Sequence, residues 1–144
     1  MTSTKRTVGA LEHLRVLDLT GYLGQACARM FGDMGADVIL VERPGGDTTR
    51  EIGPFAGDKA GPDRGLPWTA FNRNKRSVVL DLTTDEGRAN ASALAGTVDV
   101  VIEDADDDSL TDAGLGYEDL RTTNPAIVYV SMSAFGRIGT KRRY

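Results

Sequence analysis

Residues 14–42, LRVLDLTGYLGQACARMFGDMGADVILVE, decide the fold. Apolar residues gather at 14–20, recur at helical spacing over 25–34 and form a second short run at 37–42. This pattern predicts a strand, a helix that ends at Gly35 and a second strand, all within about thirty residues, which is the length of a βαβ unit. The two strands of such a unit are parallel, because a helical crossover brings the chain back to the same end of the sheet.

The rest of the chain continues this alternation. Residues 44–67 hold four of the five prolines and show no hydrophobic period, so we expect a long surface loop there. The full pattern predicts an α/β fold, a Rossmann-like parallel sheet with flanking helices, over residues 11–144, after a flexible N-terminal tail at residues 1–10. Further strands are expected at 77–82, 97–102 and 127–131, helices at 84–95 and 117–122, and a helical turn at 68–72.

Composition excludes several classes of protein. The chain has 144 residues, of which 40% are hydrophobic and 26% charged, as in one ordinary globular domain. No stretch approaches the ~18 apolar residues of a membrane span, and residues 1–10 lack the apolar segment of a signal peptide, so we expect a cytoplasmic protein without membrane contact. With Cys27 as its single cysteine, the chain has no internal disulfide. The acidic run 103–108 lacks the pattern of a calcium loop, and no metal site is predicted.

Charge is unevenly distributed along the chain. The formal net charge of -4 argues against a nucleic-acid partner. Residues 99–119 hold nine carboxylates and no Lys or Arg, so a small anionic ligand would be repelled there. The same ligand would be attracted to the stretch 43–76, whose seven cations are Arg43, Arg50, Lys59, Arg64, Arg73, Lys75 and Arg76.

Ligands of open parallel sheets bind at the carboxyl ends of the strands. Residues 21–24 form a G-x-x-G turn before a helix, which fits either phosphate binding or only a tight connection. The segment 72–77 places three cations and two amides before a strand, which fits phosphate and ribose recognition or a solvated basic turn. Glu42 lies about twenty residues beyond the glycines, where a dinucleotide fold keeps its ribose-binding acid, and this leaves a nicotinamide-dependent oxidoreductase as an alternative.

No set of residues predicts an acid, a base and a nucleophile together. His13 precedes the first strand and is expected at the surface, and Cys27 is expected to pack in the core. Ser131 and Ser133 lack a nucleophile elbow and are expected to end a strand. The residues by themselves therefore predict an α/β anion-binding domain without a catalytic group.

Several motifs recur in a characteristic order and spacing, at 14–20, 35–39, 41–47, 72–77, 81–82, 114–117, 124–125 and 131–136. In this they resemble the N-terminal part of the family III CoA-transferases, which include formyl-CoA transferase, the carnitine CoA-transferases and alpha-methylacyl-CoA racemase. The resemblance covers residues 11–144 and only the opening third or so of a usual member, so we expect a truncated domain, incomplete relative to the family.

The resemblance implies that this part of the fold holds coenzyme A. It also implies acyl-CoA and carboxylic acid substrates, and an interlocked homodimer for the full-length protein. Family contacts to CoA would fall on Tyr22, Leu23, Gly24, Arg43, Phe71, Asn72, Arg73, Asn74, Lys75, Asp104, Ala105, Asp106, Ser133, Ala134, Phe135 and Gly136.

The family reaction, as the resemblance implies it, uses an aspartate that attacks the acyl-CoA, forms a mixed anhydride and passes CoA to the acceptor acid through a thioester. In relatives that aspartate follows the loop that matches 136–144, so these residues alone are not expected to catalyse transfer. Two alternatives remain: a non-catalytic CoA- or nucleotide-binding fragment, and a racemase-like protein. The racemase would need a His and an Asp as bases, and His13 lies at the wrong end of the chain.

The acidic run departs from the family pattern. Relatives carry an Asn-Phe-Arg-Pro-Gly-like loop where this chain has the sequence DADDD at 104–108, and Asp112 stands at a usually basic position. Carboxylates beside the CoA phosphates would weaken binding by charge repulsion. We therefore expect weakened affinity for CoA.

Overall fold

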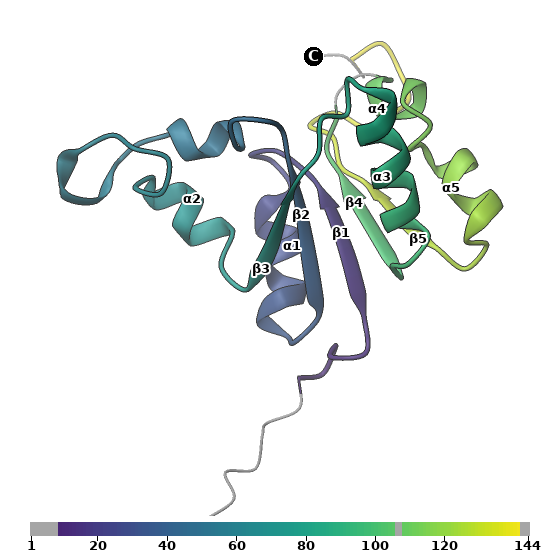
Figure 1. Cartoon of the computed structure of the whole chain (residues 1–144), viewed down its shortest axis with the longest axis horizontal. Coiled ribbons are helices and arrows are strands. Elements are labelled where there is room, and N and C mark those ends of the chain that lie inside the picture. Colours follow the sequence, from purple (N-terminus) through teal and green to yellow (C-terminus); the bar gives the residue numbers. More distant parts are fainter. Residues whose placement is uncertain (1–8, 106–107, 142–144) are drawn as a thin grey trace, which may run out of the picture.

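The computed structural model describes residues 9–105 and 108–141. Five parallel strands form one sheet in the order β3-β2-β1-β4-β5 (Figure 1). Successive connections run outward from β1 on one side and from β4 on the other, so the topological switch point lies between β1 and β4. The strands are β1 (Arg15–Leu19), β2 (Asp37–Glu42), β3 (Lys75–Val79), β4 (Val100–Glu103) and β5 (Val128–Ser131).

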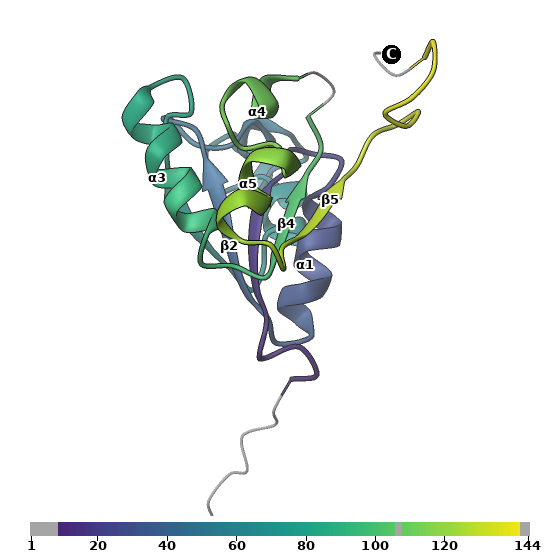
Figure 2. The same cartoon turned by 90° about the vertical axis from the view of Figure 1, so that its right-hand side faces the viewer.

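Helices cover both faces of the sheet (Figure 2). One face packs Val16, Val38 and Ile102 against α1, whose Ala28 is completely buried. The other face packs against α3 and α5. The α-helices are α1 (Gln25–Asp33), α2 (Leu66–Phe71), α3 (Asp85–Ala95), α4 (Ser109–Asp112) and α5 (Tyr117–Thr123), and the 3₁₀ helices are η1 (Thr48–Glu51) and η2 (Ala56–Asp58).

Local sequence explains where two of the helices begin and end. Thr84 caps α3, since its hydroxyl accepts a hydrogen bond from the backbone N–H of Gly87. Gly35 follows α1 with a φ of 101°, a left-handed conformation that glycine adopts at little cost. Helix α1 therefore stops where the sequence pattern predicts, and the chain turns directly into β2.

The predicted α/β fold is confirmed, and the main local error concerns β3. This strand begins at Lys75 rather than at residue 77 and ends at Val79. Because β3 is an edge strand, its outward side chains can be polar, and apolar periodicity marks its boundaries poorly. Leu80 and Leu82 lie beyond the strand and are apolar because they pack against the core.

Other expectations met mixed outcomes. The loop at 44–67 contains η1 and η2, and the short helix α4 has no counterpart in the sequence pattern.

Two single residues lie as expected. His13 is exposed, and Cys27, on α1, is partly buried and packs against the core beneath that helix. Residues 1–8 of the expected tail lie outside the described residues. No helix in the described part of the chain is long and apolar enough to cross a membrane.

Candidate functional site

The turn between β1 and α1 lies at the switch point of the sheet and is held by a carboxylate. The backbone N–H of Gly21 donates to Asp104 Oδ1 at 2.7 Å, and that of Gly24 donates to Asp104 Oδ2 at 2.8 Å. Asp104 directly follows β4, so these bonds tie the carboxyl ends of two neighbouring strands together. Two of the N–H groups that the sequence offered as a phosphate cradle, those of Gly21 and Gly24, are thus occupied by a side chain of the same chain.

Gly24 is required by packing. A Cβ atom at this position would lie 2.4 Å from Thr20 Cγ2, closer than real contacts allow. The turn therefore needs a glycine for close approach, whatever ligand it serves. The two alternatives for the G-x-x-G turn are decided in part, because packing alone accounts for Gly24.

A buried ion pair lies beneath the first turn of α1. The ammonium of Lys75 is 2.7 Å from Asp18 Oδ2, and the side chains are only 1% and 0% exposed. It also donates to Asn72 Oδ1 at 2.8 Å and to the backbone oxygen of Gln25 at 2.9 Å. Burial raises the pKa of Asp18 and lowers that of Lys75, while the attraction between the two charges opposes both shifts. Lys75 thus uses its three donors to join β1, α1 and β3.

Gln25 extends this network to the loop after β2. Its side-chain oxygen accepts hydrogen bonds from Thr49 Oγ1 at 3.1 Å and Asn72 Nδ2 at 2.9 Å. Its amide nitrogen donates to Asp47 Oδ1 at 3.1 Å. Because Gln25 is fully buried, these bonds fix the relative positions of three loops at the carboxyl edge.

Glu42 is a second buried anion and is fully engaged inside the fold. Arg50 donates from Nε to Glu42 Oε2 at 2.6 Å and from Nη2 to Glu42 Oε1 at 2.8 Å. Ser77 and the backbone N–H of Asp47 also donate to the Glu42 carboxylate. The hydrogen bond from Arg50, ahead of the other contacts, lowers the pKa of Glu42 to about 2. The guanidinium of Arg50 also stacks 3.7 Å from the ring centre of Trp68. The hypothesis that Glu42 binds a ribose is wrong for this structure, because the carboxylate is buried and its oxygens are taken.

Arg43 lies beside a cavity of about 290 Å³ at the carboxyl ends of β1, β2 and β3. Its side chain is exposed, and it donates to the backbone oxygen of Gly46 at 3.1 Å. Within residues 9–105 and 108–141, it forms no ion pair. The cavity is also lined by Gly21, Thr48, Asp81 and Thr83. We call this feature the Arg43 cavity; it combines a cation, hydroxyls and an apolar floor with the carboxylates of Asp47 and Asp81, which accept hydrogen bonds from neighbouring groups of the chain.

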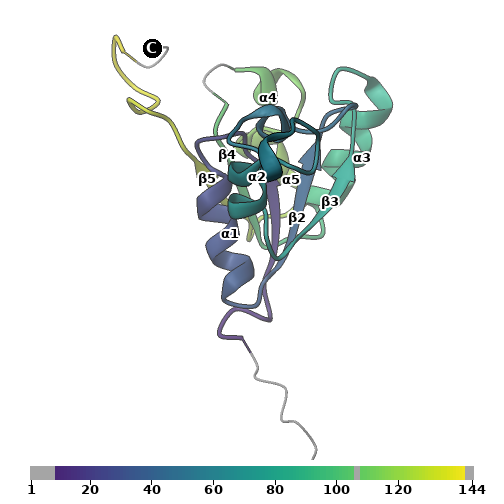
Figure 3. The same ribbon diagram turned by 90° about the vertical axis from the view of Figure 1, so that its left-hand side faces the viewer.

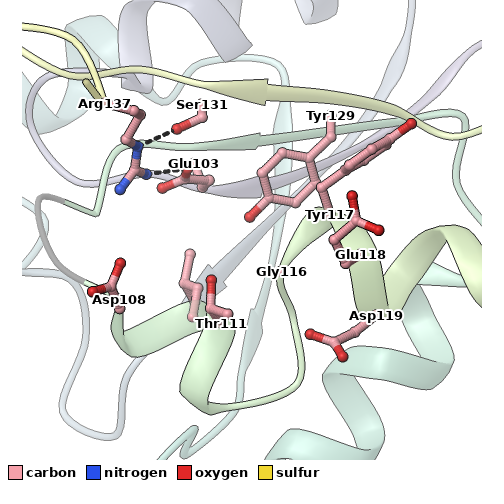
Figure 4. Close-up of a pocket in the computed structure, with 11 residues that line it drawn as sticks. Glu103, Asp108, Thr111, Gly116, Tyr117, Glu118, Asp119, Tyr129, Ser131 and Arg137 are labelled. Atoms are coloured by element: carbon pink, nitrogen blue, oxygen red, sulfur yellow. Dashed lines mark hydrogen bonds and ion pairs between the residues drawn. The ribbon is translucent and has the colours of Figure 1, made fainter.

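A larger cavity of about 370 Å³ lies beyond β4 and β5, at a place where the sequence analysis does not predict one (Figure 4). Arg137 crosses its upper wall and donates to Glu103 and to Ser131 Oγ. Tyr117 and Tyr129 form the other wall, with ring centres 6.1 Å apart. Burial, with a smaller effect of Glu103, raises the pKa of Tyr129 to about 12, so its hydroxyl stays protonated. The residues come from four elements and share no sequence motif, which is why periodicity and spacing did not find them.

The structure brings several of the expected CoA contacts together around the β1–α1 turn. Tyr22 and Phe71 meet edge to face with ring centres 6.1 Å apart, where α1 and α2 lie side by side (Figure 3). Gly24, Asn72, Lys75 and Asp104 surround the same turn through the hydrogen bonds above. Leu23 is exposed at its tip.

Other expected contacts lie elsewhere. Asn74 donates to Asp33, the last residue of α1, which places it about 13 Å along the helix from the turn at ~1.5 Å per residue. Arg73 is exposed beside it. Ala105 bonds back to Glu103, and Ser133 follows β5. Asp106 lies outside the described residues.

Among the described residues, no three His, Cys, Asp or Glu side chains lie close enough together to hold a metal. The buried carboxylates Asp18, Glu42 and Glu103 are each countered by Lys75, Arg50 or Arg137.

A parallel sheet of this strand order, with helices on both faces and polar loops at the carboxyl edge, defines a Rossmann-like class of α/β domain. A sequence model of CoA-transferase family III matches residues 11–144. The chain therefore belongs to CoA-transferase family III.

Individual relatives agree with this assignment. The chain is 45% identical over 130 residues to succinyl-CoA:mesaconate CoA-transferase of Haloarcula hispanica, covering 90% of this chain and 33% of that protein. It is 44% identical over 143 residues to succinate–glutarate CoA-transferase of Agrobacterium fabrum, covering 96% and 36%. The solved structure of a CAIB/BAIF family protein from Brucella suis superposes with a TM-score of 0.84 at 37% identity, covering 94% and 36%. The chain thus spans about a third of the length of the relatives it matches.

Proposed function

We propose that this chain is the CoA-binding N-terminal part of an enzyme that transfers CoA from an acyl-CoA donor to a carboxylic acid acceptor. The observation that carries the proposal is the Arg43 cavity, which sets a cation without a carboxylate partner among the described residues at the carboxyl edge of a family III sheet. CoA carries several phosphates, and guanidinium binds phosphate oxygens through charge-assisted hydrogen bonds.

The residues of this chain would bind and position CoA. Arg43 would hold a phosphate, while the exposed tip at Tyr22 and Leu23 offers apolar surface to the remainder of the carrier. Lys75 and Asn72 would act indirectly, because their polar atoms already hold Gln25 and Asp18 in place. The nucleophile is the aspartate that the family resemblance implies after residue 144.

The names of the relatives suggest the substrates to try first. Several are called succinyl-CoA transferases, with mesaconate, glutarate or other acids as acceptors. We therefore propose succinyl-CoA as the first donor to assay. A cytoplasmic location is part of the same proposal, because soluble acyl-CoA and acid substrates would meet the enzyme there. A homodimer is part of it too, since the family resemblance implies one for the full-length protein.

Titration of the chain with CoA by isothermal calorimetry tests the proposal. Arg43→Ala should weaken CoA binding by about tenfold or more, the value of one charge-assisted hydrogen bond. Arg76→Ala is the matched control, since Arg76 is engaged by Asp37 near the amino end of β3. The proposal fails if the wild-type chain binds no CoA at millimolar concentration, or if both variants bind as the wild type does. Preferential binding of NAD would restore the oxidoreductase alternative.

A further inference from the structure

Asp104 occupies the position where sheets of this topology usually receive a ligand. In open α/β sheets, ligands bind outside the carboxyl ends of the strands at the switch point, and phosphate groups approach the N-terminal turn of the first helix. Here that place lies between β1 and β4, and the Asp104 carboxylate lies in it.

The contact leaves neither of its two N–H donors available to a second anion. Each carboxylate oxygen of Asp104 accepts one N–H, from Gly21 at 2.7 Å and from Gly24 at 2.8 Å. Two oxygens of a phosphate would need the same two donors. A pyrophosphate would therefore have to displace a charge-assisted pair of hydrogen bonds and would then face the freed carboxylate.

Two cations, Arg137 and Arg43, lie on opposite sides of the turn that Asp104 occupies. Beyond β4, the buried Glu103 engages Arg137, so that guanidinium is already committed to a carboxylate. On the opposite side of the turn, Arg43 lines a cavity that also contacts Gly21. The β2 side of the turn thus holds a cation without a carboxylate partner among the described residues, in a cavity that Asp47 and Asp81 also line.

We propose that Asp104 is a specificity-determining residue that excludes a nucleotide pyrophosphate from the β1–α1 turn and leaves the Arg43 cavity to receive the phosphates of the bound carrier. The exclusion depends only on the contacts of Asp104. The second half, the redirection to Arg43, rests on the proposed function.

An aspartate fits this role better than an asparagine would. Asparagine has one acceptor oxygen and one NH₂ group, so one of the two backbone N–H groups would face a donor. Asp104→Asn should therefore release one of these N–H groups, and Asp104→Ala should release both.

The test uses inorganic pyrophosphate as the probe and the backbone amide signals of Gly21 and Gly24 in ¹⁵N-labelled chain as the readout. In the wild type, millimolar pyrophosphate should leave the Gly24 signal in place; a shift of the Gly21 signal alone reports binding in the Arg43 cavity, which Gly21 also lines. In Asp104→Ala, pyrophosphate should bind at least tenfold more tightly and shift both signals. Asp119→Asn, on α5, makes the same change in charge as Asp104→Asn elsewhere in the acidic stretch and should behave as the wild type.

Three results would overturn the proposal. They are a pyrophosphate shift of the Gly24 signal in the wild type, no gain in affinity for a folded Asp104→Ala, or an equal gain for Asp119→Asn. If Asp104→Ala does not fold, Asp104→Asn decides: tighter binding at the turn supports the exclusion, and unchanged binding refutes it. Failure of the proposed function would instead appear as absent CoA binding or as insensitivity of CoA binding to Arg43→Ala, with the pyrophosphate result unaffected.

Discussion

Replacing Lys75 with methionine should strip the buried carboxylate of Asp18 of its cation while keeping a side chain of similar length. The ammonium lies 2.7 Å from Asp18 Oδ2 and also satisfies Asn72 and the backbone oxygen of Gln25. All three acceptors would lose a donor in a place that water does not reach. The substitution therefore tests whether this ion pair supports the carboxyl edge of the sheet.

The magnitude follows from the separation and the burial. At 2.7 Å and an effective dielectric constant of about 20, the attraction is roughly 6 kcal/mol, and the cost of removing each ion from water is several kcal/mol. The intact pair is thus nearly balanced, but losing one partner leaves the other charge buried alone, which costs about 3–5 kcal/mol. A domain is typically stable by about 5–15 kcal/mol, so the variant should unfold far more easily.

The loss should depend on pH in a defined direction. Burial already raises the pKa of Asp18 above 3.8, and removal of Lys75 takes away the charge that opposes this rise. A carboxyl group whose pKa is higher in the folded state than in the unfolded state loses its stabilising contribution as pH rises through the folded pKa. Lys75→Met should therefore lose most relative to the wild type at neutral pH and least below the pKa of the unfolded carboxyl.

Urea unfolding followed by the fluorescence of Trp68 measures these free energies. The double variant Asp18→Asn, Lys75→Met removes the orphaned charge and should recover part of the loss, which a double-mutant cycle quantifies. Arg76→Ala breaks an exposed pair with Asp37 and should leave the midpoint unchanged. A loss below about 1 kcal/mol for Lys75→Met, or a double variant no more stable than the single one, would refute the reasoning.

Two further predictions concern the neighbouring contacts. Glu42, whose pKa falls from 4.5 to about 2, should stabilise the fold by about 3 kcal/mol above pH 4.5 and lose this as pH falls towards 2; Glu42→Gln should flatten that acid limb in urea titrations, and an unchanged slope would contradict the assignment. Gly24→Ala should cost about 1–3 kcal/mol by overpacking, since the new Cβ would meet Thr20 Cγ2 at 2.4 Å. Adding Thr20→Ser removes that methyl but keeps the Cβ of residue 20, which would lie 2.7 Å away, so it should restore only part of the midpoint; a double variant less stable than Gly24→Ala alone would contradict the packing explanation.

The fold was predictable where burial follows the period of the element. Residues 14–42 form the expected strand, helix and strand almost to the residue, since these elements are buried on the faces that the apolar spacing marks. The start of β3 was not predicted, because its first residue, Lys75, is polar and yet buried under α1. Its ammonium is buried there by pairing with Asp18, which lies 57 residues away in sequence. Local pattern carries no information about such a partner.

The site was predictable as a set of residue types but not as a set of roles. Arg43 and Arg50 are equivalent in the sequence, each a cation in a Pro- and Gly-rich stretch. In the folded chain, Arg50 pairs with Glu42 and stacks on Trp68, whereas Arg43 lines the cavity. Similarly, Asp104 was expected to repel phosphate, and the structure shows its charge held by two N–H groups of a distant turn. Roles of this kind depend on contacts between loops that are far apart in the sequence, and local sequence patterns do not show such contacts.

The basic stretch of the sequence therefore divides into charges that build the site and a charge that can bind a ligand. Lys75, Arg50 and Arg76 each neutralise a carboxylate of β1 or β2, so their charge is cancelled within the fold. Arg43 alone among these four forms no ion pair with a described residue. If the division is correct, substitution of the buried Lys75 or of Arg50 should change stability more than affinity for CoA, substitution of the exposed Arg76 should change neither, and substitution of Arg43 should change affinity more than stability. The attraction for an anion at the Arg43 cavity then depends on that residue, which makes the carboxylates that line the cavity, Asp47 and Asp81, strong determinants of which anion binds.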